Sequence, residues 1–161
     1  METPWLSERE QQTWRRLVAV LELLPGVLNS QLGRDENLTN FDYFALAMLS
    51  EAPERALRMT KLAGLTNATL ARLSNVVRRL EARALVERRP RADDRRATDV
   101  VLTDEGWATV VRAAPGHVRT VRSAVLDPLT EVQVDQLGEI CGQLLERLDP
   151  DHQMVGHDRP A

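Results

Sequence analysis

The chain of 161 residues lacks the features that several large protein classes require. Its single cysteine, Cys141, excludes an intrachain disulfide framework and provides no cluster of cysteine ligands for zinc. It has no run of about 18 apolar residues, which a membrane-spanning helix needs. The first residues have neither the basic start nor the apolar centre of a secretory signal. We therefore expect a cytoplasmic protein without a membrane partner.

Sequence features of enzymes are equally scarce. Of the three histidines, His117, His152 and His157, the last two lie in a polar stretch at the end of the chain. The sequence contains no glycine-rich phosphate loop, no nucleophile elbow and no His/Cys spacing typical of a metal site. We therefore expect no enzymatic activity, no catalytic residue, no cofactor and no bound metal.

What the chain has is the composition of an ordinary soluble domain, with 43% hydrophobic and 28% charged residues. Its length suits one domain, or a compact domain with an extra layer for association. The net charge of −3 conceals an uneven distribution, because residues 55–99 hold 12 Lys/Arg and 5 Asp/Glu and the rest hold 9 and 19. A basic module between acidic flanks is typical of a polyanion-binding protein, although composition alone is equally consistent with a solvated charged face.

A long amphipathic helix is expected at the N-terminus. It begins at Ser7, where Ser-x-x-Glu forms a capping box, and we expect a kink or a short break at Pro25 and an end near Gly33. Its apolar residues recur at spacings of three and four: Trp14, Leu17, Val18, Leu21 and Leu24.

The next helices have the spacing of a helix-turn-helix. Thr39 is the expected cap of a helix over residues 40–51, and a short helix over residues 60–65 follows. A tight polar turn leads to a fourth helix, capped by Thr69 and ending near residue 83. Two helices joined by such a turn predict the helix-turn-helix arrangement.

Two short extended runs follow, over residues 86–89 and 98–102, with a polar loop over residues 90–97 between them. This pattern predicts a β-hairpin, which makes the helix-turn-helix a winged one. The hairpin region is rich in arginine: Arg88, Arg89, Arg91, Arg95 and Arg96. We expect Arg88, Arg89 and Arg91 to contact phosphate.

The end of the chain is expected to be helical again. A helix capped by Thr103 is expected to kink or break at Pro115 and to continue over residues 118–126. A second capping box at Thr130 starts a last helix, and residues 149–161 are expected to form a flexible tail. The last helix carries an apolar strip that predicts a partner helix: Val134, Leu137, Cys141, Leu144 and Leu148.

The fourth helix is the candidate for reading DNA. A helical wheel places five apolar residues on one face, which we interpret as core: Leu70, Leu73, Val76, Val77 and Leu80. The opposite face is centred on Asn75 and includes Ala71, Arg72, Arg78 and Arg79. Arg can donate twice to guanine and Asn can bond adenine in both directions, while the other arginines and Thr69 can contact phosphates. The alternative is an ordinary exposed face, but its place before a basic hairpin favours DNA contact.

Three segments carry a family resemblance: residues 57–63, 73–88 and 94–106. The most specific element is an Asp-x-Arg wing followed by a strand and Leu-Thr-x-x-Gly. With these motifs, residues 7–148 closely resemble the MarR family of bacterial transcriptional regulators.

The resemblance implies a mainly α fold with a small β-hairpin wing, in which a winged helix-turn-helix domain is joined to an N- and C-terminal helical dimerisation layer. Residues 1–161 would form a single domain, with a DNA-binding module over residues 39–102 and dimerisation helices over residues 7–34 and 103–148. The implied protein is a homodimer that binds double-stranded DNA at a pseudo-palindromic operator.

The resemblance also assigns individual contacts. Base contacts of the recognition helix would fall on Ala71, Arg72 and Asn75. Arg96 would enter the minor groove with Arg95 beside it, and Asp94 would hold that arginine or the wing in position.

Members of the family often release DNA when a small aromatic or lipophilic effector binds between the dimer layer and the winged module. His117 and Trp14 are candidates for lining such a pocket, although each is better explained as a packing residue. Cys141 is expected to be buried in the dimer core, because a reactive thiol needs an electropositive, partly exposed site. The sequence thus predicts a DNA-binding repressor, with a winged-helix protein-interaction module as the alternative.

Overall fold

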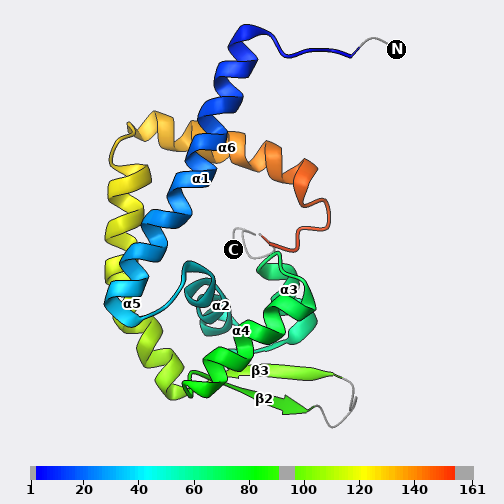
Figure 1. Ribbon diagram of the computed structural model, residues 1–161, viewed down its shortest axis with the longest axis vertical. Helices are drawn as coiled ribbons and strands as arrows, with labels where there is room; N and C mark the ends of the chain where they lie inside the picture. Colours follow the sequence, from blue (N-terminus) through cyan, green and yellow to red (C-terminus); the bar gives the residue numbers. More distant parts are fainter. Residues whose placement is uncertain (1–2, 91–96, 155–161) are drawn as a thin grey trace.

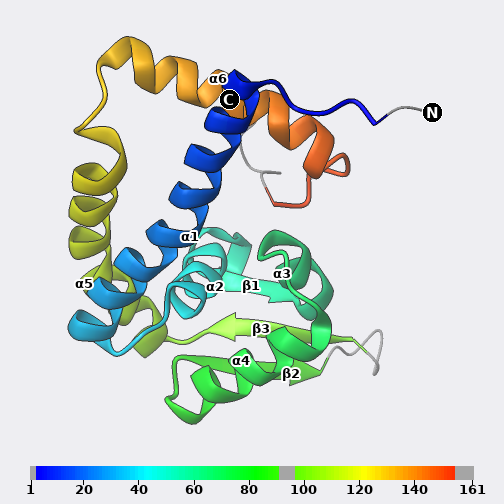
Figure 2. The same ribbon diagram turned by 45° about the horizontal axis from the view of Figure 1, so that its top comes forward.

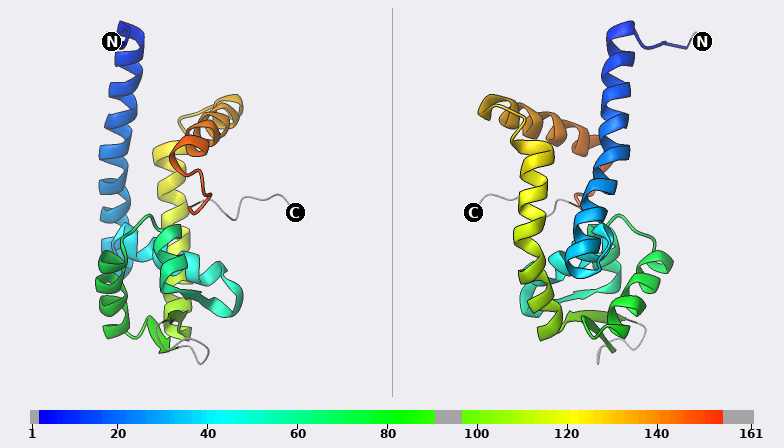
Figure 3. Two further views of the ribbon diagram at one scale, coloured as in Figure 1. Left: turned by 90° about the vertical axis from the view of Figure 1, so that its right-hand side faces the viewer. Right: turned by 60° about the vertical axis from the view of Figure 1, so that its left-hand side comes forward.

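The computed structural model describes residues 3–90 and 97–154. Its elements in chain order are α1 (Glu8–Glu36), α2 (Asn40–Glu51), the short turn η1 (Pro53–Arg55), β1 (Ala56–Arg58), α3 (Met59–Leu65), α4 (Leu70–Ala82), β2 (Val86–Pro90), β3 (Thr98–Leu102), α5 (Asp104–Val121), the π-helical turn η2 (Arg122–Leu126) and α6 (Glu131–Leu148). The elements from α2 to β3 form a head, from which α1 and α5 extend in the same direction (Figure 1). Helix α6 follows from the far end of α5 (Figure 3).

The predicted helix starts are confirmed by side-chain caps. In each case the cap side chain accepts a hydrogen bond from a backbone N–H in the first helical turn, a group that the helix itself leaves without a partner. The capping residues are Ser7, Thr39, Thr69, Thr103 and Thr130. Cap chemistry is local, which is why the sequence identifies these starts well.

The two long helices are more continuous than the sequence suggests. Helix α1 passes through Pro25 without a break and ends at Glu36, beyond the expected end at Gly33. Helix α5 likewise passes through Pro115. A proline removes only one helical hydrogen bond, and packing between helices can offset that loss. The two helices do pack closely here, because a Cβ atom on Gly116 would lie 2.8 Å from Gln31 Nε2.

The wing belongs to a sheet of three strands rather than to a hairpin alone. The strand order is β1-β3-β2 and both pairs are antiparallel, with Leu57 opposite Val100 and Val86 opposite Leu102 (Figure 2). Strand β1 was not predicted, because three residues are too few to show an alternating pattern and its partner β3 lies far along the chain. The predicted fold class, mainly α with a small β wing, is confirmed.

The core of the head lies between α2, α3, α4 and the sheet. Its largest fully buried side chains include Leu46, Leu62, Leu73, Val77 and Val100. The predicted core face of α4 is confirmed except at Leu70, which is 51% exposed. Leu70 is the first residue of α4 and lies at the edge of its apolar stripe. It lines an open surface pocket together with residues of α3 and β3.

The exit of α4 is fastened to the start of α5. Thr103 Oγ1 donates to the Ala84 carbonyl at 2.6 Å, and the Thr103 N–H donates to the Leu85 carbonyl at 3.1 Å. Gly106 allows this close approach, because a Cβ atom there would collide with the Leu85 carbonyl oxygen. Ala84 has a φ of 58°, in the left-handed region that favours glycine.

The helices outside the head expose much apolar surface in the single chain. On α1 these residues include Trp14, Leu17, Leu21 and Leu23, and on α6 they include Leu137, Ile140 and Leu144. Cys141 is also exposed, so its burial in a dimer core stays a prediction. After α6, residues 149–154 turn back toward α3, where the Asp149 carboxylate accepts hydrogen bonds from the backbone N–H groups of Gln153 and Met154. Residues 155–161 of the predicted tail lie outside the described residues.

Candidate nucleic-acid interface

Helix α4 has one buried face and one exposed face, as the wheel predicts. Leu73 and Val77 are fully buried, and the exposed residues opposite them are Ala71, Arg72, Asn75, Arg78 and Arg79. Thr69 Oγ1 accepts a hydrogen bond from the Arg72 backbone N–H at 3.2 Å. The structure therefore brings the predicted recognition residues together on one surface, with Thr69 at its N-terminal end. Contact between Thr69 and a phosphate stays a prediction.

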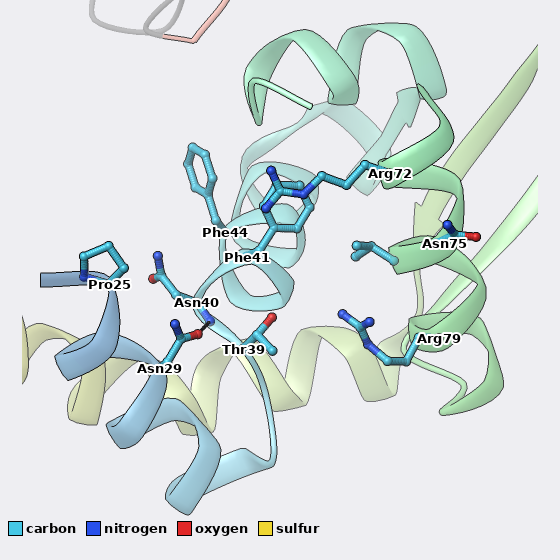
Figure 4. A pocket seen from close by; sticks show the side chains of 10 residues that line it. Pro25, Asn29, Thr39, Asn40, Phe41, Phe44, Arg72, Asn75 and Arg79 are labelled. Carbon is cyan, nitrogen blue, oxygen red and sulfur yellow. Dashed lines mark hydrogen bonds between the residues drawn. The ribbon is translucent and has the colours of Figure 1, made fainter. Parts of the chain in front are cut away.

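The Arg72 guanidinium lies over an aromatic ring of another helix. Its Cζ atom is 4.4 Å from the centre of the Phe41 ring, at the start of α2 (Figure 4). At this distance a cation is attracted to the ring face. Among the residues that the structure describes, none accepts a hydrogen bond from this guanidinium. Its N–H groups are therefore available to an external acceptor.

Arg79, two helical turns further along, is paired with a buried carboxylate. Its guanidinium forms an ion pair with Asp42 Oδ1, and the Asp42 side chain is only 4% exposed. The second oxygen of Asp42 accepts the Thr39 backbone N–H at 2.9 Å. A buried carboxylate needs such partners, because burial without them is costly. Arg79 thus anchors α4 to α2, and its predicted contact with phosphate stays a prediction.

Between these two arginines, Asn75 points away from α2 (Figure 4). Arg78 donates a hydrogen bond to Asn75 Oδ1 at 3.0 Å, and both side chains are exposed. The Asn75 amide N–H groups are left to act as donors toward a base edge.

Arg88, at the base of the wing, is used inside the protein. Its guanidinium donates to the Ser74 carbonyl at 2.8 Å and lies 3.7 Å from a Glu81 carboxylate oxygen. The side chain therefore joins β2 to α4. Its expected contact with phosphate stays a prediction. Neighbouring Arg89 forms an ion pair with Glu87.

The predicted wing-tip residues Arg91, Asp94, Arg95 and Arg96 lie outside the described residues. Their assigned roles stay predictions based on the sequence.

An open pocket of about 540 Å³ adjoins the α4 surface. It is lined by residues of α1, the start of α2 and α4: Pro25, Asn29, Thr39, Asn40, Phe41, Phe44, Arg72, Asn75, Val76 and Arg79. The Asn40 backbone N–H donates to Asn29 Oδ1 at 2.7 Å across this pocket and fixes the start of α2 to α1.

The two candidate pocket residues lie in different places. His117 packs against Tyr43, with ring centres 4.5 Å apart and ring planes tilted by 41°. Burial lowers the pKa of the imidazole below its ordinary value. Its Nδ1 atom is buried without a hydrogen-bond partner among the described residues. Trp14 is 55% exposed on α1 and lines a shallow surface pocket whose other lining residues all belong to the same helix. His117 thus packs at the junction of α2 and α5, and a role for His117 or Trp14 in lining an effector pocket stays a prediction.

Within residues 3–90 and 97–154, no group of three or more His, Cys, Asp or Glu side chains is placed to hold a metal ion. In the same part of the chain, no helix combines the length and hydrophobicity needed to span a bilayer.

Sequence reasoning missed the contribution of α2 to this surface. Phe41 and Asp42 precede α4 by about 30 residues and reach it only through the tertiary fold. The Thr-x-x-Asp capping pattern at Thr39 identifies Asp42 as a helix-start residue. Nothing in that pattern indicates its pairing with Arg79.

The turn between α3 and α4, the exposed polar face of α4 and the three-stranded sheet define the class: the chain is a winged helix-turn-helix protein. The MarR family model matches residues 38–98. A similar solved structure is the crystal structure of Sco3205, a MarR family transcriptional regulator from Streptomyces coelicolor, in complex with DNA. The sequence identity is 43% and the TM-score is 0.88, and the match covers 91% of this chain and 92% of the Sco3205 chain. AbsC, a MarR family transcriptional regulator from the same organism, is 35% identical with a TM-score of 0.87, and the match covers 92% of this chain and 99% of AbsC.

A curated relative is the HTH-type transcriptional repressor YetL from Bacillus subtilis, which is 32% identical over 103 residues. That match covers 64% of this chain and 61% of the length of YetL. The two solved structures match over nearly their whole length at more than 30% identity. This chain therefore belongs to the MarR family of transcriptional regulators.

Proposed function

We propose that the protein is a transcriptional repressor that binds a pseudo-palindromic operator in double-stranded DNA as a homodimer in the cytoplasm. The observation that carries the proposal is the exposed α4 face, where Arg72 and Asn75 offer hydrogen-bond donors on the second helix of a helix-turn-helix. Such helices enter the major groove with their N-terminal residues toward the base edges. The DNA complex of Sco3205 supports this use of the fold, and the name of YetL supports repression.

The exposed apolar residues of α1 and α6 support the homodimer. Residues such as Leu21 and Ile140 are more than half exposed in the single chain, and their side chains recur at helical spacings. A second copy of the chain would cover these side chains with its own α1 and α6, because a two-fold symmetric dimer uses the same surface of both subunits. The dimer would place two α4 helices on one duplex, so each chain reads one half-site.

Release of DNA by a small aromatic or lipophilic effector stays a prediction of the family relationship. The pocket beside Arg72 and Arg79 supports it, because a ligand there would compete with DNA for the same side chains. Effector release is tested by adding such compounds to the protein bound to a fluorescent duplex and measuring displacement of the duplex by fluorescence anisotropy.

The proposal is tested by selecting DNA from sheared genomic fragments with the purified protein. We expect a recurring two-fold symmetric sequence, bound with an affinity that falls steeply as salt rises, because phosphate contacts release counterions. The alternative, a protein-interaction module, predicts that no duplex is retained even at low salt.

A further inference from the structure

Helix α2 contributes two adjacent side chains that contact arginines of α4. Phe41 lies beneath the Arg72 guanidinium, with 4.4 Å from Cζ to the ring centre, and Asp42 pairs with Arg79. Arg72 and Arg79 are seven residues apart, about two helical turns, so both project toward α2 from one side of α4. Figure 4 shows both arginines on that side, while Asn75 points elsewhere.

The turn that presents Phe41 is held on both sides. The Asn40 backbone N–H donates to Asn29 Oδ1 on α1 at 2.7 Å. The Asp42 backbone N–H donates to Thr39 Oγ1 at 3.0 Å, and the Asp42 carboxylate accepts the Thr39 N–H. Because Asn40 and Asp42 on either side are held by these hydrogen bonds, the backbone that carries the Phe41 ring is fixed to α1 and to the start of α2.

A guanidinium held over a ring keeps its hydrogen-bonding capacity. The contact with Phe41 takes up no conventional hydrogen bond, and the five N–H donors of Arg72 have no acceptor among the described residues. A long side chain held in this way loses less conformational freedom when it binds, which favours the complex.

We propose that Phe41 is the positioning residue of Arg72: it holds the guanidinium in the geometry that reads one operator base, and so contributes to sequence specificity without touching DNA. This inference rests on the proposed operator binding. Holding the guanidinium in place strengthens binding only where Arg72 meets its matching base, because any other base offers no pair of acceptors to the aligned donors. Phe41 therefore affects discrimination at one base position rather than affinity for DNA in general.

The test uses the full chain and duplexes that the unmodified protein selects from a random-sequence pool. The base read by Arg72 is first identified as the position where Arg72→Ala abolishes the preference. Affinities for the selected operator and for its three substitutions at that position are then measured for Phe41→Leu, Phe41→Tyr and Phe44→Leu. Phe44→Leu is the matched control, because it removes another half-buried ring of α2 over which no arginine of the described residues lies.

We expect Phe41→Leu to reduce discrimination at that one position by about 2- to 10-fold, the range for loss of one immobilised side chain. Phe41→Tyr should retain discrimination because it keeps the ring, and Phe44→Leu should leave it unchanged. In Phe41→Leu/Arg72→Ala the two effects should not add, since Phe41 acts through Arg72.

Equal loss of affinity for all four operators would assign Phe41 a purely structural role and overturn the proposal. Unchanged discrimination in Phe41→Leu, or additive effects in the double variant, would also overturn it. If the unmodified protein selects no duplex, the proposed function itself fails. If it selects an operator and Phe41→Leu discriminates as well as the unmodified protein, only the role proposed for Phe41 fails.

Discussion

At the scale of single residues, the arginines around α4 differ by their partners. Arg72 contacts an aromatic ring and keeps its donors available, Arg79 neutralises buried Asp42, and Arg88 joins β2 to α4 through the Ser74 carbonyl. These tertiary contacts separate a side chain whose donors stay available from two that hold the head together. Charge alone does not make that distinction.

Arg72→Ala is expected to weaken operator binding by about 1 to 3 kcal/mol and to relax the preference at one base position. The reason is the loss of a planar donor pair aimed at a base edge. Fluorescence anisotropy with singly substituted operators measures both effects. The control is Arg34→Ala, an exposed arginine at the end of α1, which should bind like the unmodified protein. A uniform loss across all operator variants would instead indicate a phosphate contact.

Ala84→Gly is expected to raise the free energy of unfolding by about 1 kcal/mol, because Ala84 has a φ of 58° and a left-handed backbone is strained for alanine. Urea denaturation gives the change. The matched variant Ala82→Gly falls on helical backbone at the end of α4 and should lower stability. Shifts of the same sign in the two variants would contradict this account of Ala84.

At the scale of elements, the junction between α4 and α5 fixes the wing to the recognition helix. Gly106→Ala is expected to lower the free energy of unfolding by about 2 to 3 kcal/mol, since the added methyl meets the Leu85 carbonyl and the backbone must shift. Thermal or urea unfolding measures it. Gly26→Ala, where the added methyl meets nothing within 4 Å, serves as the control. Equal stability of both variants would show that the junction is not tightly packed.

The wing is the second element expected to contact DNA. Arg96→Ala should weaken operator binding by about 1.5 to 3 kcal/mol, the range for a lost charge-assisted hydrogen bond, without unfolding the protein. Gel-shift titration gives the affinity and circular dichroism checks the fold. Arg95→Ala is the neighbouring comparison and should lose less. An unchanged affinity in Arg96→Ala would remove the minor-groove assignment.

The elements also show how far the sequence alone reaches. The starts of α2, α4 and α6 were predicted, because capping and helical periodicity are local signals. Strand β1 and the contacts of Phe41 and Asp42 with α4 were not, because they depend on residues distant in the chain. A kink or a break was expected at Pro25 and at Pro115, and the break was wrong, because each long helix continues through its proline. The exposed face of α4 was thus predictable from the wheel, and the α2 side chains that contact it were not.

At the scale of the whole molecule, charge and hydrophobicity are divided between two regions. The basic residues concentrate in the head, which includes most of residues 55–99, while exposed apolar side chains lie on α1 and α6. This division fits a protein whose head contacts a polyanion and whose long helices contact a second copy. The proposed dimer combines both surfaces, because two heads bind one duplex only when the helices hold them at a fixed separation.

The central claim is that two copies read one operator through paired α4 helices. The most direct measurement is a hydroxyl-radical footprint of the purified protein on its selected operator. A dimer that reads two half-sites should give two symmetric protected regions with centres about 10 to 10.5 base pairs apart, or a multiple of that spacing. A single protected site without a symmetric partner, or the absence of protection at low salt, would contradict it.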